Sequence, residues 1–182
     1  MDNKYAILIN VLDKLREEAP ETFKKYYPKE EEIDKLNQAR SRAYIHLFLK
    51  VKFGLLDFLE RENFITDKSD DGGIDAYFID REAKTIYYIQ SKFRTTKDNF
   101  ETKNITLEEI LSMDIARITD GEQTHENGTR YNAKILQLIR EISAIGDIGR
   151  YKHQTIILAN LKETITTSQL KKLTGGFSGD VY

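Results

Sequence analysis

The stretch from residue 71 to residue 93, DGGIDAYFIDREAKTIYYIQSKF, constrains the fold of this chain more than any other. Two segments rich in Ile, Tyr and Phe, at 74–80 and 85–93, flank a polar cluster at 80–82. Two strands joined by a turn have this composition, because β-branched and aromatic side chains favour strands and polar clusters favour turns. The pattern predicts a β-hairpin with residues 81–84 as its loop.

The predicted hairpin places an acid, an amide and a lysine on one face. A loop at 81–84 sets the pairs Asp80 with Thr85, Ile79 with Ile86, Tyr77 with Tyr88, and Asp75 with Gln90. Side chains alternate between faces along a strand, so Lys92 points to the same side as Gln90. Opposed residues have Cβ atoms roughly 4.5–5.5 Å apart, which lets Asp75 and Gln90 oxygens share one small divalent ion. An Asp75–Lys92 salt bridge at a sheet edge explains the same residues without a metal.

The segments GGID, at 72–75, and IQSK, at 89–92, resemble the motifs of the PD-(D/E)xK nuclease superfamily, in the variant with Gln in place of the middle acid. The longer segments DDGGIDAYFID and YYIQSKF resemble the nuclease region of the AIPR proteins associated with abortive phage infection. The pairing is also similar to that of Mrr-type restriction endonucleases. The resemblance covers the hairpin and, through the order helix, hairpin, helix and strand, much of the chain around it.

The resemblance implies an α/β fold with a restriction-endonuclease-like mixed sheet of about four strands flanked by helices. It also implies metal-dependent hydrolysis of DNA phosphodiester bonds in defence against phage, with Mg²⁺ or Mn²⁺ as the cofactor. By the same resemblance Asp75 binds the metal, Gln90 occupies the second acidic position and Lys92 is the catalytic lysine. The backbone carbonyl of Ser91 would be a further metal ligand.

The resemblance leaves one more metal ligand to be identified. In the nuclease fold the helix before the first strand often supplies a Glu to the metal site. Here that helix carries Asp57 in its body and Glu60 and Glu62 at its end, none of them at a position that matches the family's motif. We choose Glu60 as the expected ligand.

Glycines and cations around the hairpin are candidates for contact with nucleic acid. Gly72 and Gly73 let the backbone turn tightly beside a phosphate or a metal, although a tight turn alone explains them as well. Arg94 and Lys97, followed by Lys103, come directly after the predicted site, where phosphate contacts would be needed. A solvated loop accounts equally well for Lys97 and Lys103.

Composition limits the range of partners. The net charge of −2 argues against a protein that coats nucleic acid by bulk electrostatics, so contact with DNA must be local. The chain has 0 Cys, which excludes disulfides and thiolate zinc sites. It has no apolar run of 18 residues, so the sequence supports neither a membrane span nor a signal peptide. We expect a cytoplasmic protein without membrane contact. A homodimer and further domains of a longer chain stay open.

The remaining periodicities predict the elements around the hairpin. Helices are expected at 4–18, 33–62, 106–115, 132–145 and 167–173. Gly54 is the weak point of the second of them. Strands at 63–67 and 155–159 complete the sheet. We divide the chain into an N-terminal helical extension, 1–32, and a nuclease-like domain, 33–182.

A noncatalytic module that keeps the fold for nucleic-acid binding or subunit assembly is the alternative to a nuclease. The unidentified Glu ligand and the mild negative charge support it. The histidines do not decide between the two functions. We interpret His46, in the long helix, and His153, before a strand, as structural, and His125, in a loop without a spaced ligand partner, as an exposed polar side chain.

Overall fold

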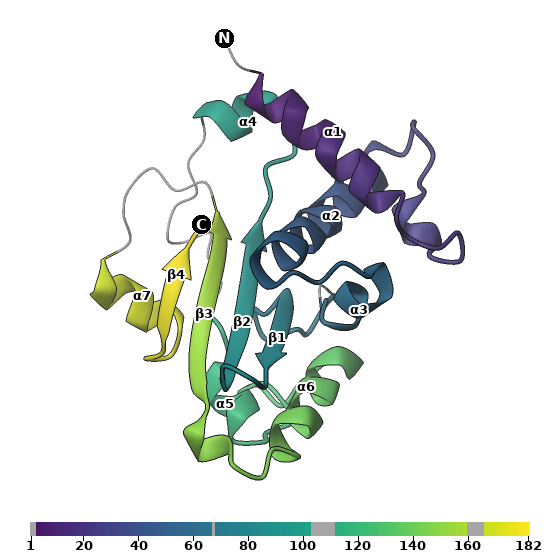
Figure 1. The fold of residues 1–182 in the computed structure, drawn as a ribbon. Coiled ribbons are helices and arrows are strands. Elements are labelled where there is room, and N and C mark those ends of the chain that lie inside the picture. The colour runs from purple at the N-terminus through teal and green to yellow at the C-terminus, as the bar shows by residue number, and fades with distance from the viewer. Residues whose placement is uncertain (1–2, 67, 103–111, 160–165) are drawn as a thin grey trace. The chain divides into compact units, whose positions relative to one another are not determined.

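The chain forms two compact units in a computed structural model (Figure 1), which describes residues 3–66, 68–102, 112–159 and 166–182. Unit 1 consists of residues 1–63 and 93–104, and unit 2 of residues 64–92 and 105–182. The predicted extension, 1–32, is part of unit 1. Contacts within the chain therefore divide it after residue 63, whereas the predicted boundary lies after residue 32.

Unit 1 is helical. Its elements are α1 (Lys4–Arg16), the 3-10 helix η1 (Lys24–Tyr26), α2 (Ile33–Phe53), α3 (Phe58–Asn63) and α4 (Lys97–Thr102). Helices α1 and α2 pack together and bury Leu12 and Leu49 completely. The long predicted helix ends at Gly54, whose φ of +69° is a left-handed conformation that glycine adopts readily at a helix terminus. The predicted weak point at Gly54 is thus confirmed.

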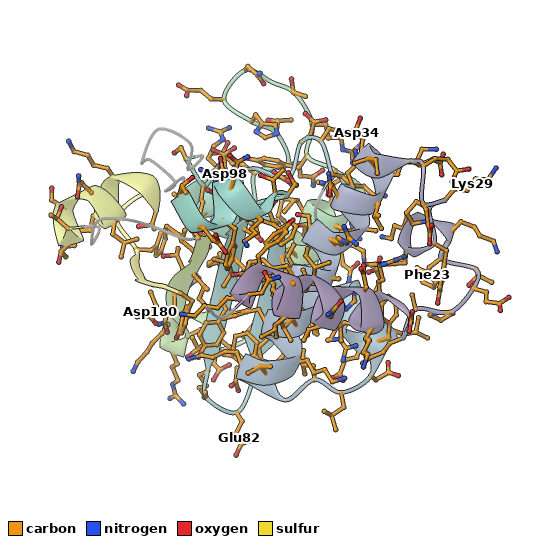
Figure 2. The ribbon with its side chains drawn as sticks, turned by 90° about the horizontal axis from the view of Figure 1, so that it is seen from above. Phe23, Lys29, Asp34, Glu82, Asp98 and Asp180 are labelled. Carbon is orange, nitrogen blue, oxygen red and sulfur yellow. The ribbon has the colours of Figure 1, made fainter. Side chains whose placement is uncertain are left out.

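Unit 2 contains the predicted hairpin. Strand β1 (Ala76–Asp80) pairs antiparallel with β2 (Thr85–Lys92), and the register joins Asp80 to Thr85, Ile79 to Ile86 and Tyr77 to Tyr88. In the turn, Asp80 Oδ1 accepts a hydrogen bond from the Ala83 N–H at 2.7 Å. The exposed Glu82 of the same turn points away from the sheet (Figure 2). Three of the four predicted pairs are confirmed, because the apolar alternation allows only one register that buries it. The ladder begins with Ala76 and Ile89, so it does not include the fourth pair, Asp75 with Gln90.

Two further strands complete the sheet. Strand β3 (Lys152–Ala159) runs parallel to β2, and β4 (Ser178–Val181) runs parallel to β3, which gives the order β1-β2-β3-β4. Unit 2 is therefore α/β with a mixed sheet of four strands, as predicted. The predicted strand at 63–67 is wrong, since its described residues form only an isolated bridge from Ile65 to Ala76. Strand β4 was not predicted, because its sequence SGDV has a single apolar residue.

Helices α5 (Ile115–Thr119) and α6 (Ala133–Ser143) cover one face of this sheet (Figure 1). The core between them joins strand residues to helix residues: Tyr77, Ile79, Ile86 and Tyr88 with Ile115, Ile118, Ile135, Leu138, Ile139 and Ile142. Helix α6 begins as predicted, because the Asn132 side chain accepts the N–H groups of Lys134 and Ile135 and so caps the helix. The same face of β2 continues past Tyr88 to Gln90 and Lys92.

The predicted helix at 106–115 differs from the structure. Residues 103–111, with the predicted capping pair, lie outside the described residues, and residues 112–114 are not helical, so α5 begins only at Ile115. Helix α7 (Thr167–Leu173) has the predicted bounds and a capping box between Thr166 and Gln169. A 3-10 helix, η3 (Ile148–Arg150), precedes β3. Of the helices described, none has the length and apolar character that crossing a membrane requires.

Candidate functional site

Asp75 directly precedes β1 and bonds to the two residues of β2 that flank Gln90. Its backbone N–H donates to the Ile89 carbonyl at 2.8 Å. Its carboxylate Oδ2 accepts the backbone N–H of Ser91 at 2.6 Å. Asp75 therefore spans Ile89 to Ser91, the two neighbours of Gln90. The Ser91 N–H fixes the carboxylate at the end of the hairpin. The pairing of Asp75 with Gln90 stays a prediction.

Gln90 is a buried amide with a defined orientation. The residue is 1% exposed, and its Nε2 donates to the Gly73 carbonyl at 2.7 Å. Burying an amide without a hydrogen bond costs free energy of folding, and the bond to Gly73 offsets that cost for Gln90. The bond also places the nitrogen end of the amide toward Gly73.

Gly73 lies between Gln90 and the segment at 112–114. It has a φ of +74°, and a Cβ built on it would lie 2.5 Å from the Ser112 carbonyl oxygen and 3.3 Å from Gln90 Nε2. No side chain fits in that space. The glycine is thus required by the close approach of Ser112 and Gln90, a packing reason that was not considered from the sequence. Contact of Gly72 and Gly73 with a phosphate stays a prediction.

Lys92 is the last residue of β2 and pairs with Ala159, the last residue of β3. It follows Gln90 by two positions, so the two side chains share a face of the strand. Lys92 is half-buried. A salt bridge between Asp75 and Lys92 stays the alternative explanation of these two residues.

Three predicted site residues belong to the other unit. Glu60, on α3, is exposed and its backbone N–H donates to Asp57 Oδ1 at 2.8 Å. Arg94 precedes α4, and Lys97 on α4 lies 3.9 Å from Glu101 in an exposed ion pair. Asp75, Gln90, Ser91 and Lys92 are all in unit 2, and Glu60, Arg94 and Lys97 are all in unit 1. The proposed roles of those three residues in metal and phosphate binding stay predictions.

An open pocket of about 390 Å³ adjoins the hairpin on the side of Gly73. Its lining includes residues 70–73, Asp114 and His125. The interpretation of His125 as an exposed polar residue is wrong, since its side chain is only 22% exposed and its Nδ1 lies 2.9 Å from Asp114 Oδ2. Sequence reasoning missed this pair because the two residues come from different loops and no periodicity links them.

Charge in the pocket is mostly negative. Asp70, Asp71 and Asp114 line it, against His125 as the one basic side chain in the lining. The Tyr131 hydroxyl donates to Asp114 Oδ2 at 2.8 Å, and burial together with the neighbouring Asp114 charge raises the pKa of Tyr131. Across the described residues, no three His, Asp or Glu side chains are already grouped as a metal site.

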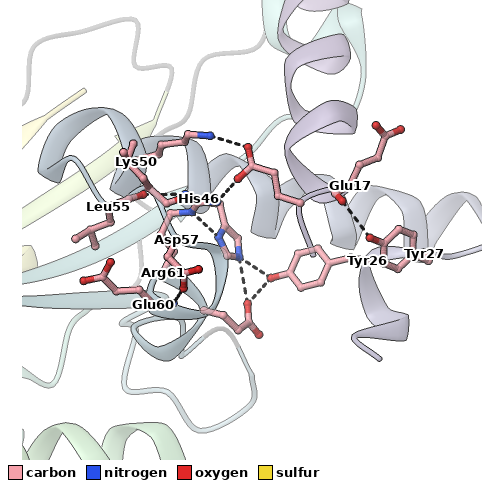
Figure 3. A network of polar contacts seen from close by, with 12 residues as sticks. Glu17, Tyr26, Tyr27, His46, Lys50, Leu55, Asp57, Glu60 and Arg61 are labelled. Carbon is pink, nitrogen blue, oxygen red and sulfur yellow. Dashed lines mark hydrogen bonds and ion pairs between the residues drawn. The ribbon is translucent and has the colours of Figure 1, made fainter. Parts of the chain in front are cut away.

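The other cluster of titratable groups, in unit 1, is closed to solvent. His46, Tyr26 and Arg61 are all 0% exposed. The Arg61 Nε donates to His46 Nδ1 at 3.2 Å, and His46 Nε2 lies 3.1 Å from Glu62 Oε2 and 2.8 Å from the Tyr26 hydroxyl (Figure 3). Because Nδ1 accepts, the ring proton is on Nε2. This network has a structural role, as predicted for His46.

Burial and hydrogen bonding act in opposite directions on the two acid–base groups of this network. Burial lowers the pKa of His46, more than Glu62 raises it, which keeps the ring neutral. Burial alone would raise the pKa of Glu62, but hydrogen bonds from His46, Lys25 and Tyr26 outweigh it and lower that pKa to about 2. Glu62 is therefore engaged inside unit 1 rather than presented as a ligand.

Neither models of protein families, nor curated proteins, nor solved structures match this chain. A function must therefore be inferred from the residues themselves. Two groups in unit 2 carry chemistry: the set Asp75, Gln90 and Lys92 at the end of the hairpin, and the pair Asp114 and His125 in the adjoining pocket.

Proposed function

We propose that unit 2 is a metal-dependent endonuclease that hydrolyses DNA phosphodiester bonds. The observation that carries this proposal is the position of a carboxylate, a buried amide and a lysine at one end of the hairpin. The Ser91 N–H holds the Asp75 carboxylate beside β2, and Gln90 and Lys92 share one face of that strand. Ligands of α/β sheets commonly bind beyond the carboxyl ends of parallel strands, which is where Lys92 and Ala159 lie on β2 and β3.

The donor atoms suit a hard cation. Mg²⁺ prefers oxygen ligands and keeps several waters, so the Asp75 carboxylate, the Gln90 amide oxygen and the Ser91 carbonyl are donors of the required kind. Mg²⁺ or Mn²⁺ bound there would supply positive charge to the scissile phosphate. The three donors carry one negative charge in total, so we expect weak binding, and a fourth ligand such as Glu60 would strengthen it.

The residues of the chain have separate roles in this proposal. The Ser91 N–H holds the Asp75 carboxylate in place, and the Gly73 carbonyl holds the Gln90 amide. Lys92 places an ammonium group beside the phosphate, where it stabilises negative charge that develops during attack. Arg94 and Lys97 would add contacts to the DNA backbone. These contacts add affinity without selecting a base sequence.

A cytoplasmic role in defence against phage accords with the motif resemblance and with a chain that contains 0 Cys. The alternative function, a noncatalytic module that binds nucleic acid or assembles with other subunits, is favoured by one observation. Among the residues that the structure describes, no group of three acidic or histidine side chains is placed to hold a metal ion.

Nicking of supercoiled plasmid DNA tests the proposal. We expect wild-type protein to nick the plasmid with Mg²⁺ or Mn²⁺ and not with EDTA. Asp75→Asn and Lys92→Ala should each lower the rate on the order of 10²-fold or more, since each removes a charge that acts on the phosphate. Asp120→Asn and Lys152→Ala are matched controls, because both residues are exposed in unit 2. Equal rates in all five proteins would show that the activity is a contaminant.

Binding without cleavage would instead support the alternative. A noncatalytic module should retard DNA fragments equally well with and without metal, and Asp75→Asn should not change that retardation. Cleavage of RNA with no cleavage of DNA would contradict the proposed substrate while leaving the phosphodiester chemistry in place.

A further inference from the structure

The pocket beside Gly73 is formed by two loops that hold His125 in one position. The His125 N–H donates to the Thr129 carbonyl at 2.8 Å, and the Gly128 N–H donates back to the His125 carbonyl at 3.0 Å. On the opposite side the Asp114 N–H donates to the Gly72 carbonyl at 2.9 Å, which ties the start of α5 to the glycine loop. Backbone contacts therefore set the walls of the pocket.

Asp114 fixes the orientation of the His125 ring. Its Oδ2 lies 2.9 Å from His125 Nδ1 and accepts the Tyr131 hydroxyl at 2.8 Å. The His125 and Tyr131 rings are in contact, with centroids 4.3 Å apart. A carboxylate accepts and does not donate, so the ring carries its proton on Nδ1 and presents the lone pair of Nε2.

His125 Nε2 is a buried atom with no hydrogen-bond partner among the described residues. The nearest carboxylate oxygen beyond Asp114 is Asp70 Oδ1, at 4.0 Å, which is too far for a hydrogen bond. An unsatisfied buried acceptor costs about 1–3 kcal/mol, and such groups in native proteins commonly mark a bound water or ion. The position of Nε2 therefore calls for a ligand.

The charge of the pocket selects the class of that ligand. Asp70 and Asp114 supply carboxylates on two sides of His125, and Asp71, whose Oδ1 accepts the Gly73 N–H at 2.9 Å, supplies a third. An anion would be repelled by these groups. A cation that accepts electron pairs from nitrogen and oxygen is attracted by all of them.

We infer that this pocket binds a divalent transition-metal ion, of the Zn²⁺ class, through His125 Nε2 and Asp70 Oδ1. Ligand bonds to Zn²⁺ are about 2.1 Å long and the usual geometry is tetrahedral, so two ligand atoms of one ion lie about 3.4 Å apart. The separation of 4.0 Å between Nε2 and Oδ1 is somewhat larger, and rotation of the exposed Asp70 side chain brings the two atoms to that distance. Asp114 then acts behind the ring, as carboxylates do behind metal-bound histidines.

The site has two ligands from the protein, and water completes the coordination. We therefore expect binding that is weaker and more readily reversed than in a structural zinc site with four protein ligands. The inference does not depend on the proposed nuclease activity. Neither His125 nor Asp70 belongs to the Asp75, Gln90 and Lys92 set, and a metal can bind here whether or not DNA is cleaved.

Long-range ¹⁵N NMR of the histidine rings tests the inference on the full chain. The chain has 3 His, so each ring can be assigned from one variant. Addition of Zn²⁺ should shift Nε2 of His125 and saturate, while His46 and His153 serve as internal controls in the same sample. The His46 ring is enclosed and both its nitrogens are engaged, so it should not respond. His153 does not line the pocket, so its ring reports nonspecific binding of Zn²⁺. Equal shifts of all three rings, or no shift of His125 at millimolar Zn²⁺, would overturn the inference.

Variants separate this site from the predicted one at Asp75. Asp114→Asn should weaken Zn²⁺ binding about 10- to 100-fold, the usual loss when the partner behind a metal-bound histidine is removed. Asp70→Asn should abolish saturation over the same Zn²⁺ range. Asp75→Asn is the control, and it should leave the His125 titration unchanged even if it stops DNA cleavage. Unchanged Zn²⁺ binding in Asp70→Asn would contradict a metal site. So would a His125 shift that saturates with guanidinium, added as an organic cation, but not with Zn²⁺.

Discussion

His46 in unit 1 and His125 in unit 2 each lie beside a carboxylate, but their surroundings differ. Both ring nitrogens of His46 are engaged, by Arg61 on one side and by Tyr26 and Glu62 on the other, and the residue is 0% exposed. The His125 side chain is 22% exposed, and only its Nδ1 has a hydrogen-bond partner among the described residues. A histidine beside a carboxylate thus stabilises unit 1. In unit 2 the same combination leaves one ring nitrogen as a position for a ligand.

The difference comes from what closes each cluster. In unit 1, the Arg61 guanidinium donates to the Leu55 and Leu56 carbonyls at 2.8 and 2.7 Å and pairs with Glu18. The same guanidinium covers His46, as Figure 3 shows. In unit 2 no cation covers Asp114 and His125 among the residues lining the pocket. In unit 1 the arginine occupies a ring nitrogen of His46, so that pair is structural. In unit 2 the pocket leaves His125 Nε2 without a hydrogen bond among the described residues.

Loss of Arg61 is the largest effect that this comparison predicts. Arg61→Ala should destabilise the protein by about 3–5 kcal/mol, because removing one partner of a buried ion pair leaves the other charge uncompensated. Two backbone carbonyls and His46 Nδ1 would also lose their donors. Urea denaturation followed by circular dichroism measures the change. Arg81→Ala, in the exposed hairpin turn, is the matched control and should stay within about 0.5 kcal/mol of wild type.

The pH dependence of stability tests the closed cluster by a second route. Glu62 has its pKa lowered to about 2 in the folded state, below its ordinary value of 4.5. The unfolded state therefore takes up the proton first, so the stabilisation is complete above pH 4.5 and is lost as the pH falls toward 2. Between those values wild type should lose about 2–3 kcal/mol more than Glu62→Gln. Parallel curves for the two proteins would show that the carboxylate is not held as the structure has it.

His46 adds to this slope at higher pH. Burial lowers its pKa in the folded state, so the unfolded chain binds a proton more readily as the pH falls below 6.5. Stability should therefore begin to fall below pH 6.5, before Glu62 contributes. The variant His46→Gln should remove this upper part of the slope and keep the lower part, which a titration of both variants resolves.

The sequence predicted the hairpin because its information is local. Alternating apolar residues and a short polar turn fix the register from Tyr77 to Tyr88, and the structure follows it. The His125 pocket and β4 could not be predicted in the same way. Asp114 and His125 meet across an irregular loop, and β4 pairs through backbone groups of SGDV that have no side-chain pattern. Contacts that depend on backbone position rather than on periodicity are not visible in one sequence.

Gln90→Glu tests the predicted metal site in unit 2. The amide Nε2 donates to the Gly73 carbonyl, so a carboxylate in its place would set oxygen against oxygen in a buried position. Without metal we expect a loss of about 1–3 kcal/mol in stability. The added charge opposite Asp75 should also tighten Mn²⁺ binding. Thermal unfolding with and without Mn²⁺ measures both, and the metal should raise the midpoint of the variant more than that of wild type.

Gln90→Ala is the control for that experiment, because it removes both the hydrogen bond and the oxygen donor. It should lose stability with no compensating gain from Mn²⁺. If Mn²⁺ stabilises Gln90→Glu, Gln90→Ala and wild type by the same amount, Gln90 is not a metal ligand and the cation binds elsewhere.

The smallest expected effect is the one that separates the two histidines most directly. His125→Ala removes one partly exposed hydrogen bond, and Asp114 keeps its bond from the Tyr131 hydroxyl, so stability should fall by less than about 1 kcal/mol. His46→Ala empties a fully buried position and strands the Arg61 Nε, so it should cost about 2–4 kcal/mol. Urea denaturation of both variants under one set of conditions gives the ratio. A loss for His125→Ala as large as that for His46→Ala would mean that the pocket histidine is structural too, because a group that exists to bind a ligand can be removed without unfolding the protein around it.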